Sequence, residues 1–308
     1  MAENQGLYQL YTTEFSTNVE ALLQQMQSKL RGKVNEKGHT GKMASPINQV
    51  GPVALKAPAG RFAPMGNQNP DLFRRWVFPQ DGELPQLIDS FDELKTIVDP
   101  KSAYVTGAGA AVGRAWDDSI ISAFFGTANL GQDAGGLTTE TFVTANFQVA
   151  STFGSGSASG LTVAKIIEAH RILEHYHNDL EMDQACMVIG SQQHADLFNQ
   201  VQIVDQLGYR GIDAQVERGR VRSVLGIEIV ISERLSVASN VRNVPVFVKS
   251  GMHLGVWKDM TNVIDYRPDL SGRPWQLLTQ TSFGATRLQA GKVISILCSD
   301  TTGADITP

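Results

Sequence analysis

Residues 32–86 contain seven of the twelve prolines of this 308-residue chain, at positions 46, 52, 58, 64, 70, 79 and 85. Each proline fixes its own φ, removes a backbone donor and pushes the preceding residue out of the helical region. A helix therefore cannot continue through this segment. At 55 residues it is also far longer than the roughly 4–6 residues of an ordinary connection inside a compact domain.

The same segment is not composed like a disordered tail, because it ends in Leu72-Phe73-Arg74-Arg75-Trp76-Val77-Phe78. Apolar and aromatic anchors of this kind need a surface to lie on. We therefore expect an extended arm that lies on another copy of the chain, with residues 74–78 as its returning strand.

Charge is unevenly distributed along the chain. Nine cations and two acids lie between Lys29 and Arg75, a net charge of +7, and since the whole chain carries −5 the remainder carries −12. One interpretation is a solvated loop. The other is a basic arm that binds either nucleic acid or the acidic body of a sister subunit. The cations are spread out and not interleaved with stacking aromatics, so nucleic acid is the weaker of these two partners.

Composition excludes several classes. A hydrophobic content of 42% and a charged content of 19% are typical of a soluble globular protein. No apolar run approaches the roughly 18–20 residues of a membrane helix, and the start Met-Ala-Glu-Asn-Gln-Gly lacks the features of a signal peptide. The two cysteines, Cys186 and Cys298, are too few for a disulfide framework or a four-cysteine zinc site. We expect buried free thiols and a reducing cytosol.

Periodicity predicts a mixture of helices and strands. Helices are expected over 13–31, 90–98, 100–126, 161–177 and 192–203, and a glycine- and serine-rich flexible link over 151–160. Strands are expected over 138–150, 187–189, 227–231, 244–248, 254–257, 263–267, 277–283 and 292–298. These elements neither alternate cleanly nor segregate cleanly, so the fold class is α+β.

A glycine-rich run, Thr106-Gly107-Ala108-Gly109-Ala110-Ala111-Val112-Gly113, resembles a dinucleotide-binding turn. That motif needs an apolar strand directly upstream and an acidic residue about 20 positions on. Here a helix start precedes the run, and Phe124-Phe125-Gly126-Thr127 follows at that distance. Close packing of a helix explains the small residues better.

Three other groupings of reactive residues also lack the context of a site. They are Asp117 with Asp118, His170 with His175 and His177, and Cys186 with His194. Adjacent carboxylates on a helix point about 100° apart, histidines near a helix end are explained by the helix terminus, and nothing orients the thiol–imidazole couple. We predict no catalytic residue, no cofactor and no metal.

Three blocks in their order and spacing resemble the major capsid proteins of tailed bacteriophages, the Hong Kong 97-type fold. The first runs from Asp99-Pro100-Lys101-Ser102 to Phe125-Gly126-Thr127-Ala128 and is similar to the spine helix of the family. The second runs from Gly160-Leu161-Thr162-Val163 through Met187-Val188-Ile189-Gly190-Ser191 to Gln193-His194-Ala195-Asp196-Leu197 and is similar to the axial domain. The third runs from Ser282-Phe283-Gly284-Ala285-Thr286-Arg287 to Lys292-Val293-Ile294-Ser295-Ile296 and is similar to the closing strands of the peripheral domain.

The resemblance implies a Hong Kong 97-like division of the chain. It has an N-terminal arm with an amphipathic helix (1–31), an extended loop (32–86), a peripheral domain with the spine helix (87–158 and 274–308) and an axial domain (159–273). The implied function is a non-enzymatic major capsid protein that assembles into the icosahedral head shell enclosing double-stranded DNA. The implied location is the virion, after assembly in the cytoplasm of the bacterial host.

The resemblance also implies partners. These are other copies in pentamers and hexamers, a separate scaffolding protein, a portal, a cementing protein as a further candidate, and packaged double-stranded DNA bound without sequence specificity; no membrane is implied. Expected assembly contacts in or next to the arm are Lys33, Lys37, Lys42, Arg61, Arg74, Arg75 and Trp76. Deletion of residues 40–80 is expected to leave a soluble body that forms no shells.

Two other functions remain open from sequence. One is the shell of a bacterial encapsulin-type nanocompartment, which is built on the same fold but encloses protein cargo. The other is a nucleotide-dependent oxidoreductase that would use Gly107–Gly113.

Overall fold

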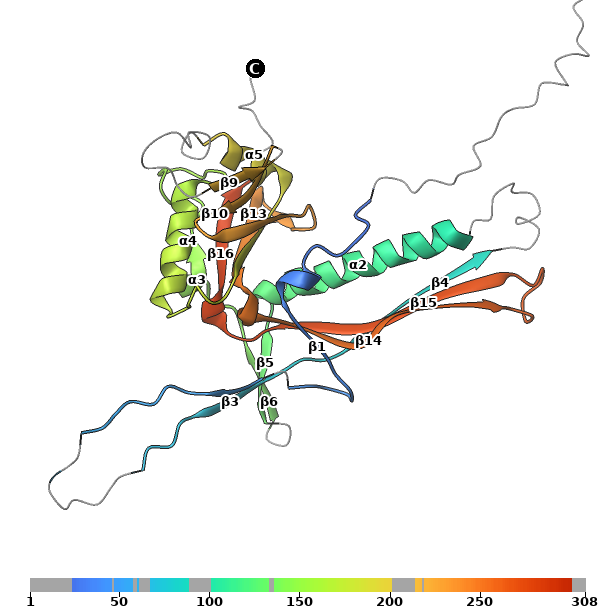
Figure 1. The fold of residues 1–308 in the computed structure, drawn as a ribbon, viewed down its shortest axis with the longest axis horizontal. Coiled ribbons are helices and arrows are strands. Elements are labelled where there is room, and N and C mark those ends of the chain that lie inside the picture. The colour runs from blue at the N-terminus through green and yellow to red at the C-terminus, as the bar shows by residue number, and fades with distance from the viewer. Residues whose placement is uncertain are drawn as a thin grey trace, which may run out of the picture.

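The computed structural model describes residues 24–45, 47–57, 60, 67–88, 101–132, 136–200, 214–217 and 219–300. These residues form three sheets and a few helices (Figure 1). The short 3₁₀ turns among them are η2 (Arg31–Lys33), η3 (Lys249–Gly251) and η4 (Ala290–Lys292). Within this part of the chain, no helix has the length and apolar character needed to span a membrane.

A long four-stranded sheet forms the extended part of the molecule, with α2 (Lys101–Phe125) running along it (Figure 1). Its strands, in spatial order, are β1 (Asn35–Gly38), β14 (Met252–Tyr266), β15 (Trp275–Arg287) and β4 (Gln80–Ile88). Alternate residues of β15, from Leu277 to Phe283, are buried, as expected for a strand with one covered face. Trp116 of α2 meets Phe283 edge to face, with ring centroids 6.5 Å apart.

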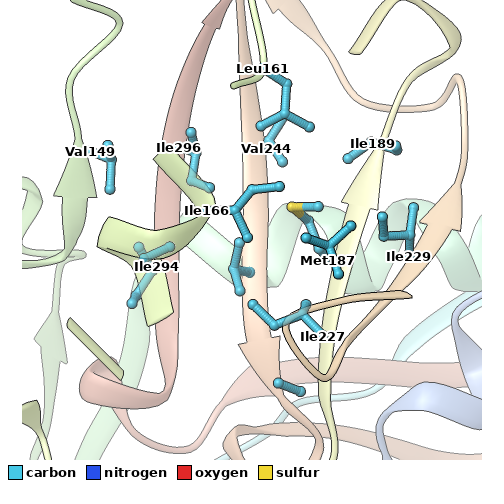
Figure 2. Close-up of a cluster of buried hydrophobic side chains, with 14 of the residues drawn as sticks. Val149, Leu161, Ile166, Met187, Ile189, Ile227, Ile229, Val244, Ile294 and Ile296 are labelled. Carbon is cyan, nitrogen blue, oxygen red and sulfur yellow. The ribbon is translucent and has the colours of Figure 1, made fainter. Parts of the chain in front are cut away.

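An eight-stranded sheet forms the compact part. Its strands in spatial order are β7 (Gln148–Val149), β16 (Val293–Ser299), β13 (Val241–Val248), β8 (Ala185–Ile189), β11 (Ile227–Ile231), β10 (Arg220–Val224) and β9 (Ala214–Glu217), and β12 (Val237–Ala238) pairs with β13. Two helices, α4 (Val163–His175) and α5 (Ser191–Phe198), belong to this part. Figure 2 shows Ile166 of α4 among Val244, Ile294 and Met187 of the sheet.

Both faces of the eight-stranded sheet are buried, so its central strand β8 is apolar at every position. Met187 and Ile189 point into the core beneath α4. Cys186 and Val188 point to the opposite face, into a second core that contains Ile120 of α2. Because successive side chains of a strand point to opposite faces, β8 contributes to both cores and so connects the two parts of the molecule.

A third sheet, of four short strands, lies apart from the two cores. Its order is β2 (Asn48–Val50), β3 (Leu72–Trp76), β5 (Ala128–Gln132) and β6 (Gly136–Glu140), and a single helical turn, α3 (Thr144–Phe147), follows it. The described residues after β2 and before β3, 51–57 and 67–71, project away from the body as the two sides of a long hairpin (Figure 1). No described residue of the proline-rich segment is in an α-helix. This confirms the prediction that a helix cannot continue through residues 32–86.

Most expected elements are present, and the α+β class is confirmed. The spine helix corresponds to α2, the helix over 161–177 to α4, and the C-terminal strands to β11, β13, β14, β15 and β16. The strands expected at 254–257 and 263–267 are one strand, β14, whose register shifts between Val256 and Thr261. At these bulges the polar residues between Val256 and Thr261 are accommodated while β14 stays paired with β15 on both sides.

Two local predictions are wrong. The expected strand over 138–150 is interrupted by α3, although its residues alternate in polarity. The expected helix over 13–31 is not helical over its described residues 24–30, because backbone donors of that stretch bond to Asp117 instead of to earlier carbonyls. The rest of that helix, the helix over 90–98 and residues 201–203 lie outside the described residues; α5 ends at Phe198.

Two strands pair with partners from another range of the expected domain division. β14 lies within 159–273 but pairs with β15 and β1 in the long sheet. β16 lies within 274–308 but pairs with β13 and β7 in the compact one. Both ends of the 32–86 segment, β1 and β4, are strands of the long sheet, so the segment that leaves the body is shorter than the prolines suggested.

Candidate assembly surfaces

The hairpin formed by β2 and β3 exposes its apolar side chains. Val50 pairs with Leu72 in the antiparallel register, and these side chains are 63% and 76% exposed. The Gly51 amide donates to the Asp71 carbonyl at 2.7 Å, just beyond the last strand pair. Val53 and Leu55, farther along, are also exposed. An apolar surface of this kind on a projecting element is typical of a protein–protein contact.

The base of the hairpin is held firmly on the body. Ala44 and Val77 exchange backbone hydrogen bonds of 3.0 and 2.9 Å. The Trp76 ring is buried, and its Nε1 donates to the Gly131 carbonyl at 2.8 Å. Arg75, also buried, forms an ion pair with Glu140 of β6. The hairpin is therefore anchored at its base, and Gln49 Nε2 of β2 also donates to the Leu288 carbonyl of the body at 3.1 Å.

A second contact surface is the segment of residues 24–30, which lies across α2. Asp117 is fully buried, and its carboxylate accepts hydrogen bonds from Gln25 Nε2, Ser28 Oγ and the amides of Lys29 and Leu30. The two amide bonds are 3.0 and 3.2 Å long. Leu30 is buried in the core beneath α2. One carboxylate thus positions the chain that leads to β1.

The helix leaves room for this segment only because position 113 is glycine. A Cβ on Gly113 would lie 2.8 Å from the backbone nitrogen of Ser28, closer than such atoms approach one another. The dinucleotide turn is thereby excluded, because its residues lie in the middle of α2 and pack against another part of the chain. The sequence predicts small residues for close packing, and this is confirmed for Gly113; a Cβ on Gly107 would meet no other atom within 4 Å.

The expected contact residues divide into two groups, apart from Arg61, which lies outside the described residues. Lys33 Nζ bonds to both carboxylate oxygens of Glu228 at 2.5 and 2.6 Å, and, like Arg75 and Trp76, it is engaged within its own subunit. Lys37 and Lys42 are solvent-facing and form no ion pair within the described part of the chain. Arg74 donates to Asn48 at 2.8 Å and lies over the Trp76 ring.

The remaining candidates for chemistry are structural. Asp118 pairs with Arg234 on the surface while its neighbour Asp117 is buried, so the two carboxylates point apart as expected. Burial raises the pKa of both thiols, Cys186 and Cys298, to about 12, and both are free. Within the described residues no three His, Cys, Asp or Glu side chains gather as a metal site.

Sequence reasoning missed a buried lysine in α4. Lys165 is fully buried, and its Nζ donates to the carbonyls of Ser159, Gly160 and Leu297 at 2.8, 2.9 and 3.2 Å. Burial lowers its pKa. The amine ties the glycine- and serine-rich link to β16. Its side chain is buried although residues one and two positions apart on a helix point in different directions, so the apolar stripe of α4 gives no signal for this cation.

Comparison with known proteins gives a consistent result. A family model described as phage capsid protein matches residues 7–300. No curated protein matches the sequence. Among solved structures, the capsid of cyanophage P-SCSP1u is 15% identical, with a TM-score of 0.73 and coverage of 98% of this chain and 97% of that chain.

Two further structures are similar over nearly their whole length. The capsid of Helicobacter pylori bacteriophage KHP30 is 10% identical, with a TM-score of 0.71 and coverage of 97% and 98%. The capsid of cyanophage Pam1 is 13% identical, with a TM-score of 0.70 and coverage of 98% and 100%. At these identities the structural likeness establishes a shared fold.

Proposed function

The chain belongs to the phage capsid protein family, and from that premise we propose how its structure builds a shell. It is a major capsid protein, and its copies assemble into the shell of a phage particle. The similar solved structures are likewise phage capsids, so the alternative of an encapsulin-type nanocompartment is not favoured. One copy holds the next through an exposed hairpin and through complementary charge.

The β2–β3 hairpin is the clasp between neighbouring copies. The observation that carries this proposal is the combination of exposed apolar side chains, including Leu72 and Phe73, with a base that is fixed to its own subunit. Burying one such side chain yields about 1.5–3 kcal/mol. Because the base is ordered in advance, less conformational entropy is lost when the hairpin binds.

Charge complementarity orients the clasp. The expected contacts at Lys37, Lys42 and Arg74 face solvent at or near the hairpin base, and Lys56 lies farther along it with no ion pair in the described residues. Arg61 is proposed to act with them. The rest of the chain carries −12, so an acidic neighbouring body attracts the basic hairpin. Lys33, Arg75 and Trp76 hold the hairpin and the strand before it to their own body.

The division of the chain follows the sheets. We propose a peripheral domain built from α2 and the long sheet, and an axial domain built from the eight-stranded sheet with α4 and α5. The boundaries at 87–158, 159–273 and 274–308 then need two changes, because β14 joins the peripheral sheet and β16 the axial one.

The remaining partners follow from membership of a shell. Copies are proposed to form pentamers and hexamers in the cytoplasm of the bacterial host, with a separate scaffolding protein, a portal and a cementing protein. The enclosed double-stranded DNA is bound without sequence specificity. The role is structural rather than enzymatic, and it is supported by buried, unreactive thiols and by a glycine run that is occupied by packing.

Shortening the hairpin tests the clasp. Replacing residues 52–70 by Asn-Gly joins Gly51 to Asp71, which are already hydrogen bonded, through a turn that suits a two-residue hairpin. The strands β2 and β3, and with them the base, are retained. We expect soluble, folded subunits that form no closed shells, as seen by electron microscopy and sedimentation.

A second variant keeps the hairpin at full length and replaces the exposed apolar side chains of its paired strands. Val50→Thr, Leu72→Thr and Phe73→Thr together preserve strand propensity while removing the contact area. These subunits should also fail to close into shells. Normal particles from both proteins would show that the hairpin does not hold neighbouring copies together.

A further inference from the structure

His39 and His253 meet at the edge where β1 joins the body. Their Nε2 atoms lie 2.8 Å apart, and their rings cross edge to face with centroids 5.1 Å apart. His253 belongs to β14 and is buried, at 4% exposure, whereas His39 directly follows β1 and is half-buried. Since β1 is an edge strand that leads toward the hairpin, this contact joins the start of the arm to the long sheet.

Further contacts next to the histidine pair attach residues 39–41 to β14. The His39 amide donates to the Val256 carbonyl at 2.9 Å, and Trp257 Nε1 donates to the Gly41 carbonyl at 2.8 Å. The His39 and Trp257 rings lie 5.3 Å apart. Gly255 makes this approach possible, because a Cβ there would lie 2.8 Å from His39 Cδ2.

The distance between the two imidazoles restricts their protonation. A contact of 2.8 Å between two Nε2 atoms contains one proton, which one nitrogen donates and the other accepts. Two neutral rings satisfy this requirement, and so does one neutral ring facing one charged ring. When both rings are charged, both Nε2 atoms carry a proton, the hydrogen bond is lost and two positive charges face each other.

The neighbouring groups do not compensate a second charge. Burial, the charge of His39 and that of Lys37 lower the pKa of His253 to about 4. Burial and Lys37 also lower the pKa of His39. β14 contributes the uncharged Trp257 and β15 the uncharged Thr286 opposite His253. Within the described residues no carboxylate acts on either imidazole.

We propose that the His39–His253 pair is an acid-sensitive latch, which keeps β1 on β14 until both imidazoles are protonated and then releases it. Both folded-state pKa values are below the ordinary value of 6.5, so the released state binds more protons than the latched state. The stability of the contact is therefore fully present above about pH 6.5 and is lost as the pH falls toward 4. The chain between η2 and the hairpin base then loses its attachment to the body.

Hydrogen–deuterium exchange of the full chain tests this latch. Unassembled subunits are followed from about pH 8 to about pH 4 through the peptide that covers residues 33–44, with rates corrected for intrinsic exchange. We expect protection in this peptide to fall roughly tenfold per pH unit between about pH 6 and 4, while the peptides of β13 and β16 stay protected. Because the subunits are unassembled, the result does not depend on what the hairpin binds in a shell.

Variants of the pair supply the control. A glutamine amide donates to a neutral imidazole and accepts from a charged one, so His39→Gln and His253→Gln should each keep β1 protected down to about pH 4. His177→Gln, which removes an exposed histidine outside the pair, should behave like the unaltered chain. Parallel pH profiles for all four proteins would overturn the proposal.

A second readout covers the case in which a glutamine variant loses protection at every pH. In the unaltered chain, ¹³C-labelled imidazoles report the titration directly. We expect one resonance with a midpoint near pH 4 that coincides with the loss of protection at 33–44. Midpoints at about pH 6 or above for both imidazoles of the pair would contradict the latch.

Discussion

At the scale of single residues, two adjacent carboxylates, Asp117 and Asp118, lie in different environments. Asp117 is buried and gathers four donors from the segment of residues 24–30, whereas Asp118 lies on the surface with Arg234. Helical geometry alone predicts that the two point apart. It does not predict the hydrogen-bond partners of each carboxylate. The donors to Asp117 come from about 90 residues upstream, and no sequence pattern relates them to this carboxylate.

Asp117→Asn tests the buried carboxylate. Hydrogen bonds to a charged group contribute about 1.5–3 kcal/mol, and an amide cannot accept from all four donors. We expect a loss of about 2–3 kcal/mol in the free energy of unfolding in urea, and faster proteolysis within residues 24–30.

Asp118→Asn is the matched control, since it makes the same change one position along the helix. Its pair with Arg234 is about half exposed, at 47% for the Asp118 side chain, and exposed pairs contribute roughly 0–1 kcal/mol. Equal losses for the two variants would show that the carboxylate at 117 does not hold the segment.

At the scale of elements, most helices and strands could be predicted from periodicity, and the exceptions have local causes. β4 was missed because Pro85 lies inside it, yet a proline is tolerated there since β4 is an edge strand of the long sheet. The alternation around 143–149 predicted a strand, but the residues form α3 between two short strands. Of the four apolar residues in that alternation, Phe147 and Val149 are buried, whereas Val143 and Ala145 are exposed.

The glycines of α2 show how an element adapts to its neighbour. A Cβ on Gly107 would meet no other atom within 4 Å, whereas one on Gly113 would face the backbone of Gln27 and Ser28. Intrinsic helix propensity predicts the same cost for both glycines relative to alanine. Only the second needs to be glycine.

Alanine substitution at these two positions should therefore act in opposite directions. Gly107→Ala is expected to raise the free energy of unfolding by about 0.5–1 kcal/mol, the usual gain inside a helix. Gly113→Ala is expected to lower it by about 1–3 kcal/mol, as overpacking does, with increased exchange of amides 27–30. Stabilisation by both substitutions, measured by urea unfolding, would contradict the close approach described for Gly113.

At the scale of the whole molecule, the sequence predicted an α+β shell protein with a basic extended arm, and the fold class and the shell function are confirmed. The charge split along the chain is partly neutralised within one subunit. Arg31 pairs with Asp259, and Lys33 with Glu228, both outside the basic stretch. Intramolecular pairing of this kind cannot be read from a linear count of charges, because each acid lies in a different element.

Charge inversion on the hairpin tests its role in assembly. Lys56→Glu should leave the unfolding free energy within about 0.5 kcal/mol, as is usual for surface positions, but should slow shell formation measured by light scattering. Assembly of the unaltered chain should also slow as salt rises above about 0.1 M, where charges more than about 10 Å apart are screened.

Arg171→Glu provides the control, because it makes the same charge change on the exposed face of α4, away from the hairpin. It should assemble at nearly the unaltered rate. Equal slowing by both substitutions would attribute the effect to total charge rather than to the hairpin.

The place of β16 in the eight-stranded sheet has a consequence for synthesis. β16 lies between β7 and β13, not at an edge, although its residues, 293–299, follow all the other strands of the sheet in the chain. A polypeptide still on the ribosome therefore has a gap inside this sheet, between β13 and the short edge strand β7, until residue 299 has emerged. Products that stop earlier leave β7 and β13 without the strand between them, so the backbone N–H and C=O groups along their facing sides stay unpaired. The sheet can therefore be completed only after residue 299 has emerged.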